Sequence, residues 1–172
     1  MRMLNRYFTP FALVLTALAV YFRIDEFKDA GLQAPAIAAG ILVADLLVNW
    51  VIGRNQYKWM AWSKQLRLIQ VWLNYLWAVP LFHLLYPFWA PMWLLFTMAP
   101  TAAALVLTKR DTVVCALASA GTMIALYWHR QPLEGVFLGM ALSQAAFIVI
   151  FALFVHGLAE TALRLRDVNV SA

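Results

Sequence analysis

Long apolar stretches run along this chain, and short segments between them hold nearly all of the charged residues. A helical crossing of a bilayer needs roughly 20 mainly apolar residues, whereas buried strands are much shorter. The pattern therefore predicts an all-α polytopic membrane protein with six transmembrane helices in one bundle. We expect these helices at residues of about 7–24, 30–53, 68–89, 92–107, 112–128 and 136–158.

The longest polar interruption, residues 54–67, lies between the second and third predicted helices. On a helix, Trp59 and Trp62 fall on one side, and Lys64 and Arg67 fall away from that side. This arrangement is typical of an amphipathic segment on the membrane surface, with its cations toward anionic lipid or a protein partner. The alternative is a plain extension of the third helix into the cytoplasm.

The other connections are shorter. Residues 87–91 form an uncharged turn bounded by two prolines, and residues 108–111 form a tight basic turn before the fifth helix. Residues 129–135 are expected as an external loop. Residues 159–172 are expected as a cytoplasmic tail, in which Arg164 and Arg166 are further candidates for docking a partner.

Composition excludes an ordinary soluble domain. Hydrophobic residues make up 65% of the chain and charged residues 12%, against about 25% charged residues in soluble proteins. With 172 residues and six crossings, a single transmembrane domain is expected. The net charge of +5 does not indicate nucleic acid binding, because the cations lie between apolar stretches and not along a basic groove. The expected partner of these cations is the lipid bilayer.

Lysine and arginine are unequally divided between the two sides of the predicted helices. An excess of these residues marks the cytoplasmic loops of membrane proteins. A cytoplasmic amino terminus leaves Arg23, Lys28 and Arg130 outside, and six helices then return the carboxyl terminus to the cytoplasm. The ten remaining cations lie inside: Arg2, Arg6, Arg54, Lys58, Lys64, Arg67, Lys109, Arg110, Arg164 and Arg166.

Asp45 is the one acidic residue within a predicted span. An aspartate at mid-membrane costs about 2.5–3.5 kcal/mol on insertion scales, so it needs a polar partner or water. Asn49 is one turn further along the same helix face, and Asn74 is expected at a similar depth on the third helix. These residues predict either a protonatable or ligand-sensing cluster, or a structural hydrogen-bonded pair that fixes the packing of the second and third helices.

Other polar residues in the spans give weaker indications. Gln144 is expected to form an interhelical hydrogen bond or to contact a substrate. His83 and His129 both fall toward the external side but lack the spacing of a metal motif, so they are weak metal candidates. Cys115 is expected to behave as a small hydrophobic residue. No catalytic residue and no cofactor are expected.

Aromatic residues gather near the predicted helix ends, as in Trp50, Trp77 and Trp89. This distribution is typical of an anchoring belt at the membrane interface. A pigment or quinone pocket would use the same residue types.

Several segments together resemble a known architecture. They are the entry Leu68-Ile-Gln-Val-Trp-Leu-Asn74, the aromatic and proline-containing run of residues 87–100, a small-residue helix after Lys109-Arg110, and the charged segment of residues 159–167. This order resembles the six-helix amino-terminal input region of bacterial sensor histidine kinases, in which the last helix leads into a charged signalling helix. The resemblance implies a sensor-like protein of the bacterial inner membrane that acts in signal transduction, here without a kinase domain.

Three functions are compatible with this sequence. The first is a non-enzymatic sensory or coupling module that signals to a protein partner or acts as a homo-oligomer. The second is a small transporter, or the substrate-binding membrane subunit of one, with Asp45 and Gln144 lining a cavity. The third is an accessory subunit that contributes packing to a large membrane complex.

Overall fold

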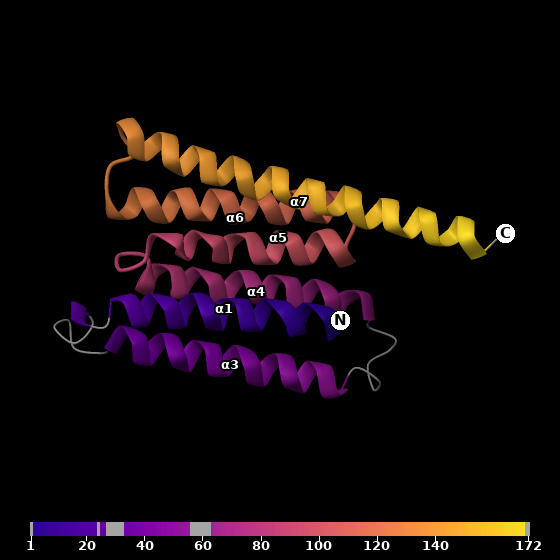
Figure 1. The fold of residues 1–172 in the computed structure, drawn as a ribbon, viewed down its shortest axis with the longest axis horizontal. Helices are drawn as coiled ribbons and strands as arrows, with labels where there is room; N and C mark the ends of the chain where they lie inside the picture. Colours follow the sequence, from indigo (N-terminus) through magenta and orange to yellow (C-terminus); the bar gives the residue numbers. More distant parts are fainter. Residues whose placement is uncertain (1, 24, 27–32, 56–62, 171–172) are drawn as a thin grey trace. The chain divides into compact units, whose positions relative to one another are not determined.

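A computed structural model describes residues 2–23, 25–26, 33–55 and 63–170 (Figure 1). These residues are almost entirely helical and contain no strand, so the all-α prediction is confirmed for them. The elements are α1 (Arg2–Phe22), α3 (Gln33–Asn55), α4 (Ser63–Leu85), the 3₁₀ helix η2 (Ala90–Leu94), α5 (Leu95–Val106), α6 (Lys109–Arg130) and α7 (Gly135–Val170).

Four of the described helices are long and apolar enough to cross a membrane, as a helical membrane protein requires. They contain the segments Gln33–Ile52, Gln65–Leu85, Lys109–Arg130 and Gly135–Leu165. Two further apolar helices are shorter, Pro10–Phe22 and Ala90–Val106. Large apolar side chains are exposed along these helices, as surfaces covered by lipid would be. Six crossings and the sides of the termini stay predictions.

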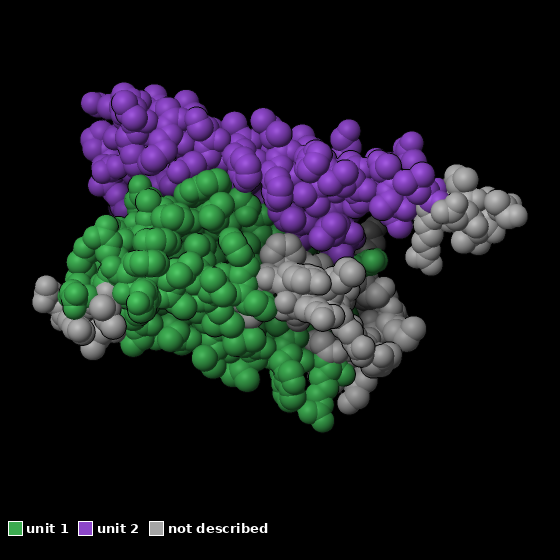
Figure 2. All heavy atoms as spheres, in the orientation of Figure 1, with its two compact units in different colours: residues 1–98 green, residues 99–172 purple. Residues whose placement is uncertain are grey.

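Contacts between helices divide the chain into two compact units, Met1–Met98 and Ala99–Ala172 (Figure 2). The single transmembrane domain stays a prediction. In the first unit, α1 packs against α3, α3 packs against α4, and η2 contacts both α1 and α4. In the second unit, α6 packs along α7.

The start of α6 differs from the prediction, because residues 109–111 form the first helical turn and not a connecting turn. Thr108 is the N-cap: its hydroxyl oxygen accepts a hydrogen bond from the Asp111 backbone N–H at 3.3 Å, and the hydroxyl donates to Asp111 Oδ2 at 2.8 Å. A threonine three residues before an acid is close to a capping box, which satisfies backbone donors that have no partner inside the helix. The carboxylate also suits the positive end of the helix dipole.

Helix α7 extends beyond both predicted limits. His129 and Arg130 belong to the last turn of α6, so residues 131–134 alone connect the two helices. Gly135 begins α7 with a φ of 50°, which glycine adopts without the penalty that a Cβ would impose. At the other end the helix continues to Val170, because the predicted tail is rich in the good helix formers Ala, Leu, Arg and Glu.

Both helices of the packed pair α6 and α7 carry buried small side chains. Ala116 and Ser119 on α6 are fully buried, as are Ala141 and Ala152 on α7. Small residues let helix backbones approach closely in lipid, where van der Waals packing replaces the hydrophobic effect as the main source of association. The buried small residues are therefore compatible with close packing of α6 along α7.

Candidate functional site

The candidate site is built around two polar residues of α3. Asp45 and Asn49 are one turn apart and are 7% and 4% exposed. The Asn49 side-chain amide donates a hydrogen bond of 2.9 Å to Asp45 Oδ1. Residues four apart lie on the same helix face, which is why the spacing brings these two groups together. The hydrogen-bonded pair on α3 is thus present in the structure.

The α3 pair is connected to α4 through Gln70. The Gln70 amide donates a hydrogen bond of 3.0 Å to Asn49 Oδ1, and Gln70 is only 2% exposed. A chain of three buried polar side chains, Gln70 to Asn49 to Asp45, therefore joins the two helices. Such a chain fixes both the rotation of each helix and their relative height, because every member has to reach its partner.

Sequence reasoning identified Asn74 but did not single out Gln70. The two residues lie on one face of α4, four positions apart, as Asp45 and Asn49 do on α3. The same four-residue spacing of polar residues on both helices could have identified Gln70 from the sequence. Since α3 and α4 are consecutive packed helices that run in opposite directions (Figure 1), the contact of Asn49 with Gln70 places Asp45 opposite Asn74, one turn away.

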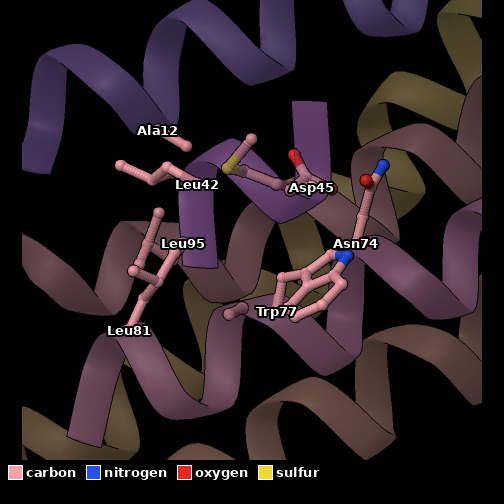
Figure 3. Close-up of a pocket in the computed structure, with 9 residues that line it drawn as sticks. Ala12, Leu42, Asp45, Asn74, Trp77, Leu81 and Leu95 are labelled. Atoms are coloured by element: carbon pink, nitrogen blue, oxygen red, sulfur yellow. The ribbon is translucent and has the colours of Figure 1, made fainter. Parts of the chain in front are cut away.

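A small cavity lies beside Asp45, within the first unit. Figure 3 shows Asp45 and Asn74 at its polar end, with Trp77 beside them and aliphatic side chains completing the wall. About 20 Å³ of the cavity is open to the centre of a water-sized sphere. The lining residues come from α1, α3, α4 and α5, and they are Ala12, Leu42, Asp45, Asn74, Trp77, Ala78, Leu81, Leu95 and Met98.

Gln144 takes part in a separate contact in the second unit. Tyr127, which is fully buried on α6, donates a hydrogen bond of 2.6 Å to Gln144 Oε1 on α7. This is the interhelical hydrogen bond that the sequence left as one of two readings for Gln144. Further along α7, the His156 ring nitrogen Nδ1 lies 3.1 Å from the backbone oxygen of Ala104.

The predicted docking residues have different surroundings. Trp59 and Trp62 lie outside the described residues, and so do the side chains of Lys64 and Arg166. Arg67 is half-buried on α4. Residues 63–67 are the first turn of α4, so this part of the predicted interfacial segment is continuous with the helix that follows.

Arg164 is the remaining predicted docking residue, and it lies on the far end of α7. Its side chain is 79% exposed and lies 3.5 Å from Glu160, one turn earlier. An exposed ion pair of this kind contributes about 0.3–0.5 kcal/mol to the helix. Arg164 is therefore accessible to a partner.

The two histidines named as weak metal candidates are both exposed, His83 on α4 and His129 in the last turn of α6. Among the described residues, no group of three or more His, Cys, Asp or Glu side chains is arranged to hold a metal ion. Cys115 is a buried free thiol on α6.

Comparisons with protein-family profiles, with curated proteins and with solved structures found no match to this chain. Three structural features bear on function: the polar chain between α3 and α4, the cavity beside it, and the length of α7.

Proposed function

We propose that this chain is a non-enzymatic, multi-pass protein of the bacterial inner membrane that couples a change in helix packing to a cytoplasmic protein partner. It crosses the membrane six times and has both termini in the cytoplasm. The Lys and Arg distribution supports this orientation. The four long and two shorter apolar helices support the number of crossings.

The length of α7 carries the proposal. The helix has 36 residues, which corresponds to about 54 Å at 1.5 Å per residue, against about 30 Å for the hydrocarbon core of a bilayer. Its first charged residue is Glu160, so roughly the last ten residues continue as a polar helix. A rigid helix that passes without a break from lipid into water transmits rotation or translation from one end to the other. The resemblance to sensor kinase input regions supports the same direction of signalling.

A photo-crosslinking amino acid at Leu163 tests whether a partner contacts this helix. Leu163 is 61% exposed in the polar part of α7, and Ile150, 67% exposed in the apolar part, is the matched control position. In native membranes we expect one protein adduct at Leu163, identified by mass spectrometry, and lipid adducts at Ile150. Truncation after Leu158 should abolish association with the same protein. No protein adduct at Leu163, or association that survives truncation, would contradict the proposal.

Insertions that rotate the end of α7 about the helix axis provide the second part of this test. Two alanines inserted after Leu158 rotate the remainder of α7 by about 200°, whereas seven inserted residues rotate it by only about −20°. If α7 transmits a rotation, the two-residue insertion abolishes the Leu163 adduct and the seven-residue insertion retains it. Equal effects of the two insertions would indicate a flexible tether.

Transport is the second candidate function, and the cavity beside Asp45 favours it. Intramembrane acidic residues in cavities often mark ion or substrate pathways. The Asp45→Asn variant retains the size of the side chain and removes its charge. Transport requires that this variant lose uptake in proteoliposomes across a panel of radiolabelled cations; uptake equal to the parent protein would exclude a role for the carboxylate.

A further inference from the structure

Hydrogen-bonding groups converge on the cavity beside Asp45. The Asn49 amide donates to Asp45 Oδ1, and the carboxylate of Asp45 lines the cavity. The indole nitrogen Nε1 of Trp77 is buried and has no hydrogen-bond partner within the described residues. Figure 3 shows this nitrogen on the side of the indole ring that faces Asn74. A tryptophan with a buried, unpartnered N–H and an aspartate thus line the same small space.

The two groups are complementary to a bridging molecule. An indole N–H is a donor only, and a carboxylate oxygen is an acceptor. Leaving the Trp77 N–H unpaired in a low-dielectric interior is unfavourable, which is why buried polar groups normally have partners. A molecule that accepts from Trp77 and donates to Asp45 would bridge the two. Asn74, which offers both a donor and an acceptor, provides a third contact.

The size of the cavity limits what this molecule can be. A single water needs about 10–15 Å³ on the measure by which this cavity has about 20 Å³. An organic substrate is too large. A bare cation would fit, but the N–H of Trp77 directs positive charge into the space and would oppose it.

We propose that the cavity binds one water molecule, which accepts a hydrogen bond from Trp77 Nε1–H and donates one to Asp45 Oδ2. This water forms a second polar connection between α3 and α4, beside the direct connection through Asn49 and Gln70. Asp45 is one turn from Asn49 on α3, and Trp77 is about two turns from Gln70 on α4. The proposal is independent of any partner of α7. It makes the packing of α3 against α4 dependent on hydration of a single buried site.

The test is a water-contact measurement by NMR on the ¹⁵N-tryptophan-labelled protein in lipid nanodiscs. Comparison with Trp77→Phe assigns the Trp77 indole signal. We expect a cross-peak from water to the Trp77 indole N–H with the sign of a long-lived bound water. Trp89 is the matched control, because its Nε1 is also buried without a partner in the described residues but does not line the cavity; its indole should show no such cross-peak.

Three outcomes would overturn the proposal, and the third concerns a variant of Asp45. One is the absence of a bound-water cross-peak at Trp77 in the parent protein. Another is a shift of the Trp77 indole signal when sodium chloride is replaced by choline chloride, because that would indicate a cation in the site. The Asp45→Leu variant, which removes the acceptor, should lose the cross-peak at Trp77. Persistence of the cross-peak in a folded Asp45→Leu variant would show that Asp45 does not hold the water.

Discussion

The hydrogen bond from Gln70 to Asn49 can be tested quantitatively by a double-mutant cycle. Its length is 3.0 Å, and its two side chains are 2% and 4% exposed. Interhelical hydrogen bonds in membrane proteins contribute about 0.6 kcal/mol on average in such cycles and about 1.7 kcal/mol at most. Because burial prevents water from replacing the lost partner, we expect the pair to couple within this range. Asn49→Leu and Gln70→Met remove the polar groups while nearly conserving side-chain volume.

The two single variants should differ in their effects. Asn49→Leu also removes the donor of the hydrogen bond to Asp45, so it should lower the free energy of unfolding more than Gln70→Met does. The double variant should lose less than the sum of the two single losses, by the coupling energy. Titration with SDS in mixed micelles, followed by tryptophan fluorescence, measures these free energies. The cycle cancels any other contacts that either side chain makes.

Ser143→Ala is the control, because it removes a hydrogen bond within a single helix. The Ser143 hydroxyl donates to the Gly139 backbone oxygen on its own helix, and the residue is exposed. Surface changes of this kind are usually within about 0.5 kcal/mol. A coupling energy of zero between Asn49 and Gln70 would refute the polar connection between α3 and α4, provided that Ser143→Ala leaves the free energy of unfolding unchanged.

Three further predictions concern the second unit and use the same unfolding assay. Tyr127→Phe removes the hydrogen bond to Gln144 and should lower stability by about 0.6–1.7 kcal/mol; no loss would contradict the contact. Thr108→Ala removes the N-cap of α6 and should lower the free energy of unfolding by about 1 kcal/mol. The unfolding transition should then occur at a lower fraction of SDS. Ala141→Leu overpacks the contact between α6 and α7 and should cost about 1–3 kcal/mol, whereas Ala146→Leu on the exposed face of α7 should be silent; equal effects would place Ala141 outside the contact.

The hydrophobic pattern predicted the helices well because apolar stretches of membrane length have few alternatives to a helix. It predicted their ends less well. Thr108 and His129 are polar residues at helix termini, where caps and dipole interactions extend the helix past its apolar part. The extension of α7 to Val170 depends on helix propensity in a polar segment, which hydropathy does not measure.

The candidate site was predictable where it depends on spacing within one helix. The pairing of Asp45 with Asn49 follows from positions four apart. The partnership with Gln70 depends on the relative height of α3 and α4, which no pattern within either helix determines. Trp77 was expected in an interfacial belt, because the sequence does not show that its indole nitrogen is buried beside the cavity.

Spin labels measure directly whether α7 continues without a break from lipid into water. Labels at Ile150 and Leu165, which are 67% and 62% exposed, would be placed in a Cys115→Ala background in liposomes. One unbroken helix predicts a narrow distribution of distances between the labels, centred at about 22 Å, from 1.5 Å per residue. It also predicts that oxygen relaxes the label at 150 and that a water-soluble nickel complex relaxes the label at 165. A broad distribution of distances, or two labels with the same accessibility, would contradict a helix that carries motion out of the membrane.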